Sequence, residues 1–154
     1  MAARILDGKA IAQQVRDELK ARVATATASG VQPGLAALLV GDNPASASYV
    51  ASKTQACAEL GIFSETFRLP ATTTQDELLE LVDRLNADAR FHGILPQLPL
   101  PRQIDEGSII NRISPAKDVD GLHPVNMGKL MRGDDGPRPC TPAGIQEILV
   151  RSGY

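Results

Sequence analysis

The sequence contains no tryptophan, only 3% aromatic residues and only two cysteines among its 154 residues. So few aromatic rings argue against a surface that stacks on sugars or on nucleic-acid bases. The thiols of Cys57 and Cys140 are too few for a disulfide framework and have no zinc-ligand spacing, so both are expected to be reduced. This pattern favours a cytoplasmic protein.

The sequence also lacks a charge excess and a long apolar run. Sixteen basic residues against eighteen acidic ones give a formal charge of −2, so no nucleic-acid partner is expected. The most apolar stretch, residues 35–40, is far shorter than the ~20 residues that cross a bilayer. The chain also opens without a basic flank followed by a long apolar signal segment. We therefore expect no membrane partner and no export.

With 43% hydrophobic and 22% charged residues, the composition is that of one globular domain. Apolar periodicity and capping residues predict helices and strands that alternate along the chain. The helices are expected at 8–29, 44–60, 75–89, 103–112 and 141–153, with a helical turn after Pro124, and the strands at 35–40, 63–69 and 93–95.

Several local signals support this assignment. Residues 35–40 are apolar throughout, which is typical of a strand covered on both faces in a parallel sheet. Asp42 or Asn43 can cap the helix that Pro44 opens, and residues 74–77 form a capping box. Thr141 is expected to cap the last helix. Together they predict a three-layer α/β/α fold with a mostly parallel sheet.

Ligands of such sheets tend to lie beyond the carboxyl ends of the strands, where Gly41, Pro96 and Asp118 are expected to converge. The helix 44–60 would bring a polar stripe to this edge, because Ser46, Tyr49 and Lys53 are spaced by three and four residues. Lysine can move a proton there and tyrosine offers a flat ring. The same spacing also fits an ordinary amphipathic surface with a lysine stem lying along it.

Two further segments carry candidate polar groups. Gln97 is the one amide in the stiff stretch 93–101, where it is either a preorganised donor and acceptor or part of a rigid connector. Its neighbours Pro99 and Pro101 are both candidates for a cis peptide bond.

Asp118 and Asp120 flank Val119, and alternation predicts that at most one of them enters a site. A carboxylate there suits a ligand edge with two N–H donors, and the alternative is a solvated acidic turn. His92 and His123 stand apart from other ligand types, so no metal site is predicted. No GxxxxGK[ST] motif occurs and no GxGxxG motif follows a strand, so a nucleotide-phosphate cradle is not expected either.

Four motifs occur in an order that resembles a known family. They are Ser46-Ala-Ser-Tyr-Val-Ala-Ser-Lys53, Gly93-Ile-Leu-Pro-Gln-Leu-Pro-Leu-Pro101, Pro115-Ala-Lys-Asp-Val-Asp-Gly-Leu-His-Pro124 and Cys140-Thr-Pro-Ala-Gly144. From Leu6 to Tyr154 the chain is similar to the bifunctional methylenetetrahydrofolate dehydrogenase/cyclohydrolase family. Pro96 and Leu122 depart from the valine and phenylalanine that are common there.

The resemblance implies a fold of the amino-acid-dehydrogenase-like N-terminal domain type and an enzyme of one-carbon folate metabolism. Its members oxidise 5,10-methylenetetrahydrofolate to 5,10-methenyltetrahydrofolate with NADP or NAD and hydrolyse that product to 10-formyltetrahydrofolate. Lys53 would be the acid/base group, with Gln97 bonded to it, and Asp120 would bind the pterin edge. The other substrate-binding residues it implies are Tyr49, which would stack on the folate, and Ser46, Leu98 and Cys140.

Family members are typically about twice as long, with a second, Rossmann domain that binds the nicotinamide cofactor. Residues 1–154 are therefore expected to form the folate-binding catalytic domain, whose last helix, 141–153, leads to that domain. The chain would be a piece of a longer protein or a natural truncation, without a cofactor of its own, and the whole protein would be a homodimer. The alternatives are a non-catalytic folate-binding or interaction module and a truncated scaffold that self-associates through an exposed apolar patch.

Overall fold

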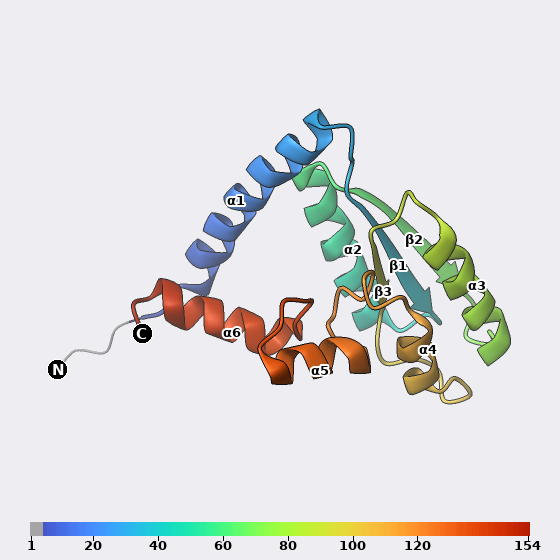
Figure 1. The fold of residues 1–154 in the computed structure, drawn as a ribbon. Coiled ribbons are helices and arrows are strands. Elements are labelled where there is room, and N and C mark those ends of the chain that lie inside the picture. Colours follow the sequence, from blue (N-terminus) through green and yellow to red (C-terminus); the bar gives the residue numbers. More distant parts are fainter. Residues whose placement is uncertain (1–4) are drawn as a thin grey trace.

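The computed structural model describes residues 5–154, in which helices and strands alternate as predicted (Figure 1). In chain order they are α1 (Gly8–Ala28), β1 (Gly34–Val40), α2 (Pro44–Leu60), β2 (Phe63–Leu69), α3 (Gln75–Ala87), β3 (Gly93–Pro96), α4 (Glu106–Arg112), α5 (Pro124–Arg132) and α6 (Cys140–Arg151). The expectation that the chain opens without a signal segment depends in part on residues 1–4, which lie outside the described residues.

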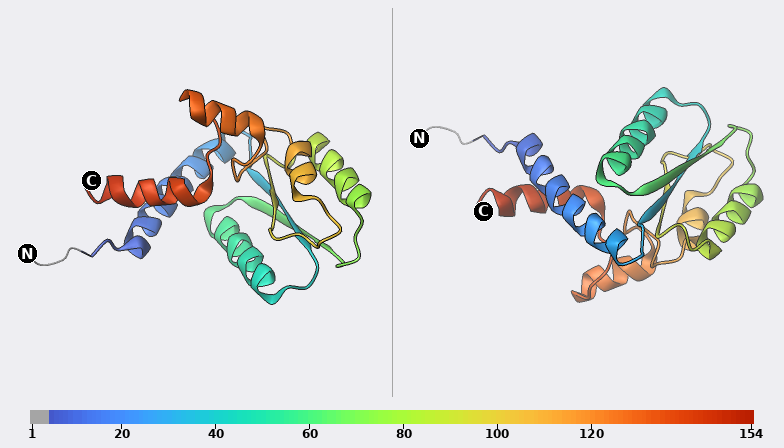
Figure 2. Two further views of the ribbon diagram at one scale, coloured as in Figure 1. Left: turned by 90° about the horizontal axis from the view of Figure 1, so that it is seen from below. Right: turned by 90° about the horizontal axis from the view of Figure 1, so that it is seen from above.

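The three strands form one parallel sheet in the order β2-β1-β3, so β1 is central. Its Ala36 lies beside Glu65 on one neighbour and Ile94 on the other. Helix α2 covers one face of the sheet, and α3 and α4 lie on the opposite side (Figure 2). The predicted three-layer arrangement is therefore confirmed.

Strand β1 is buried on both faces because successive side chains of a strand point in opposite directions. The larger core lies between the sheet and the helices α3 and α4, with Leu38 and Phe91 among its fully buried side chains. The smaller core, on the α2 side, consists of Ala37, Leu39 and Val50. The all-apolar sequence of β1 thus reflects its place between two helical layers.

Two helix starts form as the sequence predicts. Asn43 caps α2, because its side-chain oxygen accepts the backbone N–H groups of Ala45 and Ser46 at 2.9 and 3.3 Å. At the start of α3, Glu77 accepts the backbone N–H of Thr74 at 2.7 Å, and Thr74 accepts that of Glu77 at 3.3 Å. Such reciprocal bonds satisfy donors that the first turn of a helix leaves unpaired.

Three predicted boundaries are wrong. Helix α4 begins at Glu106, after Asp105 as N-cap, rather than at residue 103. The expected turn after Pro124 is a full helix, α5, whose N-cap is His123. Helix α6 starts at Cys140, so Thr141 lies inside its first turn and is not its cap.

Helices α1 and α6 extend away from the sheet and meet near their outer ends (Figure 1). Arg151 joins them by donating to both carboxylate oxygens of Glu18, at 2.7 and 2.8 Å. This pairing lowers the pKa of Glu18 and raises that of Arg151. Along α1, Val23 is buried and Ile11, Val15 and Leu19 are half-buried, because the outer part of the helix has no sheet beneath it.

Between residues 5 and 154, no helix combines the length and the apolar character needed to cross a membrane.

Candidate active site

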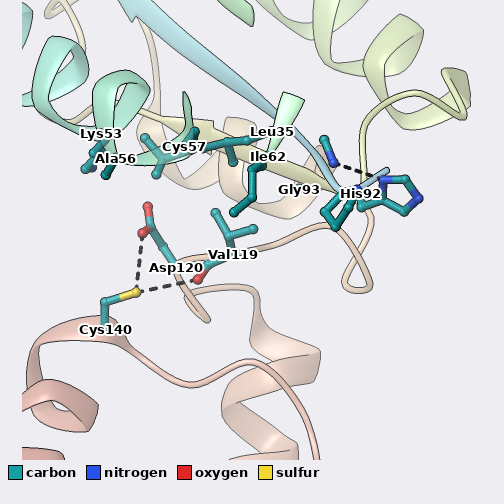
Figure 3. Close-up of a pocket in the computed structure, with 13 residues that line it drawn as sticks. Leu35, Lys53, Ala56, Cys57, Ile62, His92, Gly93, Val119, Asp120 and Cys140 are labelled. Carbon is teal, nitrogen blue, oxygen red and sulfur yellow. Dashed lines mark hydrogen bonds between the residues drawn. The ribbon is translucent and has the colours of Figure 1, made fainter. Parts of the chain in front are cut away.

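A cavity of about 530 Å³ lies between α2, the amino-terminal parts of β1 and β3, and the turn that carries Asp120 (Figure 3). Its walls are mainly apolar, and Lys53, Asp120 and Cys140 bring polar groups to it from three different segments. The other lining residues are Pro33, Gly34, Leu35, Ala56, Cys57, Ile62, His92, Gly93, Leu95 and Val119. A partly apolar cavity with a few converging polar groups is typical of a small-molecule site.

Lys53 reaches the predicted glutamine. Its Nζ donates to Gln97 Oε1 at 3.2 Å, and both side chains are half-buried. The Gln97 amide is fixed in turn, because its Nε2 donates to the Leu98 carbonyl oxygen at 2.8 Å. The side-chain oxygen of Gln97 therefore faces Lys53, and the Lys53 amine is held by an acceptor that carries no charge.

The other members of the predicted stripe lie outside the lining of the cavity. Ser46 is buried near the start of α2, whereas Tyr49, one turn before Lys53, is 64% exposed. Leu98 packs its side chain against the larger core and comes to the site through its carbonyl oxygen. The peptide bond between Leu98 and Pro99 is cis.

The two aspartates of the 118–120 turn point in different directions, as the alternation predicts. Asp118 is buried, and its Oδ2 accepts the backbone N–H of His123 and the Nδ2 of Asn126, both at 2.8 Å. Asp120 instead lines the cavity and extends toward the helix that carries Lys53 (Figure 3). Of these two aspartates, Asp120 is the one that lines the cavity.

Asp120 is paired with Cys140 across the mouth of the cavity. The Cys140 thiol lies 3.8 Å from Asp120 Oδ1 and 3.5 Å from the Val119 carbonyl oxygen (Figure 3). Burial raises the pKa of the Asp120 carboxyl and Asp118 adds to this, while Lys53 and the thiol act in the opposite direction. Although Cys140 as a residue is exposed, partial burial of its sulfur and the carboxylate of Asp120 raise the pKa of its thiol.

Close backbone packing places the Asp120 turn, and the sequence alone did not reveal it. Gly121 has a φ of +67°, and a Cβ built on it would lie 2.4 Å from the backbone carbon of Arg138. A Cβ on Gly93 would lie 2.4 Å from Cγ1 of Val119. The glycines that follow Asp120 and begin β3 were the available signal, because glycine is often required where one backbone approaches another.

The structure corrects the predicted place of Asp118. A parallel bridge places Asp118 beside Ile94, the second residue of β3, and not at the carboxyl edge beyond Gly41. Gln97 follows the end of β3, but the cavity itself extends toward Gly34 at the start of β1. The chain runs parallel to β3 at this bridge, and Asp120 follows two residues later.

Both histidines use Nδ1 as an acceptor: His92 takes the backbone N–H of Gly34 at 3.2 Å, and His123 that of Val125 at 3.1 Å. Across the described residues, no three His, Cys, Asp or Glu side chains gather into a group that could hold a metal ion.

The first strand-to-helix turn does not suit a dinucleotide cofactor. In dinucleotide-binding folds, free N–H groups at such a helix start hold the pyrophosphate. At α2, Asn43 already accepts the N–H groups of Ala45 and Ser46, Pro44 has none, and Asp42 adds a negative charge. These residues therefore offer no cradle for NADP or NAD.

Comparison with known proteins identifies relatives of the whole described chain. Residues 6–120 match the family model for the catalytic domain of tetrahydrofolate dehydrogenase/cyclohydrolase. Proteins named bifunctional protein FolD from Geotalea daltonii and Moorella thermoacetica are 52% and 54% identical, over 98% and 99% of this chain. The alignments cover 54% and 55% of those proteins, so the chain spans about half their length.

Solved structures give the same result. A FolD methylenetetrahydrofolate dehydrogenase/cyclohydrolase from Campylobacter jejuni matches with a TM-score of 0.96 and 46% identity, over 98% of this chain and 54% of that one. The Trypanosoma brucei enzyme, solved with NADP cofactor and inhibitor, matches with a TM-score of 0.94 and 38% identity, over 100% and 54% of the respective chains.

Proposed function

Since the chain belongs to the tetrahydrofolate dehydrogenase/cyclohydrolase family, we propose that its cavity binds the pterin ring of a tetrahydrofolate derivative and that Lys53 moves protons there. The observation that carries this proposal is the Lys53–Gln97 hydrogen bond beside a cavity that Asp120 enters from the opposite wall. The pair of polar walls suits a flat, partly apolar ring with hydrogen-bonding edges.

Each group has a chemical role in this proposal. Asp120 accepts the two N–H donors of the pterin edge through its two carboxylate oxygens. Tyr49, whose ring is exposed on α2, stacks on the folate, and Ser46, Leu98 and Cys140 help to shape the site. These assignments make residues 5–154 one folate-binding catalytic domain built on a single sheet.

The cyclohydrolase reaction needs little beyond these groups. Water bonds to the electrophilic methenyl carbon and loses a proton. The bond from this carbon to N5 then breaks as N5 takes a proton, and the hydroxyl group on the carbon releases its own proton to become the formyl oxygen, so one proton is released overall. Lys53 can accept the first proton and deliver the second, which is general acid–base catalysis by one group. Gln97 assists by holding the Lys53 amine at 3.2 Å without neutralising it with a carboxylate.

The dehydrogenase reaction also needs a nicotinamide cofactor, which accepts a hydride from the methylene carbon. The residues at the start of α2 do not fit the pyrophosphate of such a cofactor, so we propose that this turn does not bind NADP or NAD. The homodimer and the cytoplasmic location expected for the whole protein remain predictions.

The test is hydrolysis of 5,10-methenyltetrahydrofolate without nicotinamide, followed by absorbance, using this chain and Lys53→Gln. Glutamine keeps a hydrogen-bonding group beside Gln97 but cannot act as an acid or a base near neutral pH, so the catalysed rate is expected to fall about 100-fold or more. Lys20→Ala, which removes an exposed lysine of α1, is the matched control and should leave the rate unchanged.

Titration of the chain with a folate analogue separates the remaining outcomes. Binding without lysine-dependent hydrolysis would favour a non-catalytic folate-binding module over an enzyme. If the wild-type chain showed neither hydrolysis above background nor binding, the proposed function would be wrong for this chain.

A further inference from the structure

Asp118 and Asn126 form a buried polar pair behind the cavity. Asp118 is 4% exposed and Asn126 is fully buried, and Asn126 Nδ2 donates to Asp118 Oδ2 at 2.8 Å. The same nitrogen donates to the Pro115 carbonyl oxygen at 2.8 Å, and Asp118 also accepts the backbone N–H of His123. The proposed reaction uses neither side chain.

The pair ties together both ends of the segment that carries Asp120. Pro115 and Asp118 precede Asp120, whereas His123 and Asn126 follow it, so the hydrogen bonds close a loop around it. On its outer side the segment is joined to β3, where the Ile94 N–H donates to the Lys117 carbonyl oxygen at 2.8 Å. Asp120 thus projects from a loop that is fixed on two sides.

The asparagine at position 126 acts through its donor group, because Nδ2 serves two acceptors, the Pro115 carbonyl oxygen and Asp118 Oδ2. Among the described residues, its Oδ1 has no hydrogen-bond partner although the atom is buried. A buried polar atom without a partner reduces the free energy of unfolding, and an apolar residue of similar size would avoid that loss. The donor group of Asn126 therefore provides something that an apolar side chain would not.

We propose that the Asp118–Asn126 pair is a positioning device that holds the Asp120 carboxylate toward the cavity and against Cys140. In this view Asn126 fixes the loop, and Asp118 fixes the loop and adds a negative charge behind the binding carboxylate. That a positioned Asp120 carboxylate serves folate recognition rests on the proposed function, but the positioning itself is measurable without any folate.

The titratable groups that face Asp120 come from three segments. Lys53 faces it from α2, Cys140 from α6, and Asp118 from its own loop. Burial raises the pKa of the Cys140 thiol, Asp120 and Asp118 raise it further, and Lys53 lowers it. Cys140 is therefore a built-in reporter of where Asp120 lies.

The experiment is alkylation of the ligand-free chain by iodoacetamide across a range of pH, with each cysteine quantified by mass spectrometry. The thiolate is the reactive form, so the rate below the thiol pKa rises when that pKa falls. Of the two cysteines in the sequence, Cys140 is exposed and Cys57 is buried. Alkylation of Cys57 thus reports loss of the fold, and alkylation of Cys140 reports the site.

Asn126→Ala removes the donor, so Asp120 should move away from the thiol and the Cys140 profile should shift to lower pH. We expect alkylation at pH 7.5 to become about three- to tenfold faster while Cys57 stays protected. Asp118→Asn keeps an oxygen that can accept both hydrogen bonds and removes only the charge, so a smaller increase of about twofold is expected. Asn86→Ala is the matched control, because Asn86 also bonds the backbone twice, at Arg112 and Ser114, away from the cavity.

An unchanged Cys140 profile in Asn126→Ala, with Cys57 protected, would overturn the proposal. If Cys57 of that variant reacts, the fold is lost and Asp118→Asn decides: a shifted Cys140 profile supports the device, and an unshifted one refutes it. A shift of equal size in Asn86→Ala would also refute it, because the effect would then be general loosening. None of these outcomes depends on folate binding, so failure of the proposed function is recognised separately.

Discussion

Replacement of Gly121 by alanine is expected to loosen the site by separating the Asp120 turn from the segment before α6. Gly121 has a φ of +67°, a left-handed backbone conformation that residues other than glycine adopt with difficulty. Its new Cβ would also lie 2.4 Å from the backbone carbon of Arg138, where ordinary contact begins at 3.4 Å. One of the two backbones must therefore move by about 1 Å.

The size of the effect follows from these two contributions. A left-handed backbone costs a residue with a Cβ roughly 1–2 kcal/mol. Overpacking against neighbours that cannot relax freely costs roughly 1–3 kcal/mol more. We expect the free energy of unfolding of Gly121→Ala to fall by about 2–5 kcal/mol.

Urea unfolding followed by circular dichroism measures this change, since the chain has no tryptophan for fluorescence. Gly128→Ala is the matched control: Gly128 lies inside α5, and a Cβ there meets no atom within 4 Å. That variant should gain about 0.5–1 kcal/mol, because glycine is unfavourable within a helix. If both variants were stabilised, the close approach of Gly121 to Arg138 would not exist in solution.

Three further predictions concern single side chains. Thr74→Ala should lower the free energy of unfolding by about 1 kcal/mol, because the bond to the Glu77 N–H is lost; an unchanged urea midpoint would contradict this. Asp120→Asn should unfold at higher urea yet no longer bind a folate analogue, since burial raises the pKa of this carboxyl and ionising it at neutral pH opposes folding. Arg151→Met should destabilise the chain slightly at pH 7 and less at pH 3. Arg151 lowers the pKa of Glu18, so the ion pair stabilises the fold above the ordinary value of 4.5, and this stabilisation is lost as the pH falls through the lowered pKa. An equal difference at both pH values, measured by thermal unfolding, would argue against that coupling.

Local sequence signals predicted the frame of this fold well. The apolar run of β1, the Asn43-Pro44 start of α2 and the capping box of α3 each depend on residues within one turn or strand, and each formed as expected. Helix α6 began earlier than predicted because a proline is tolerated throughout the first turn, where the backbone N–H has no helical partner, and Pro142 is the third residue of the helix.

The site depended on contacts that no local pattern encodes. The Lys53–Gln97 hydrogen bond joins residues 44 positions apart, and sequence spacing alone left both residues with an ordinary alternative. The place of Asp118 beside Ile94 is set by tertiary packing, so a rule based on strand ends misplaced it. The family resemblance supplied the candidate site residues. The structure added Gly121 and Asn126, whose contacts fix the turn that carries Asp120.

The two edges of the sheet differ in their exposure to other chains. Beyond β3 the backbone is occupied, because Ile94 donates to Lys117 and Pro96 has no N–H to offer. Within residues 5–154, no strand lies on the outer side of β2, which makes it the edge where intermolecular strand pairing and aggregation would start. Glu65 and Arg68 place charges along β2, and charged side chains on an edge strand oppose such pairing. The protection of this edge against aggregation thus depends on two charged side chains.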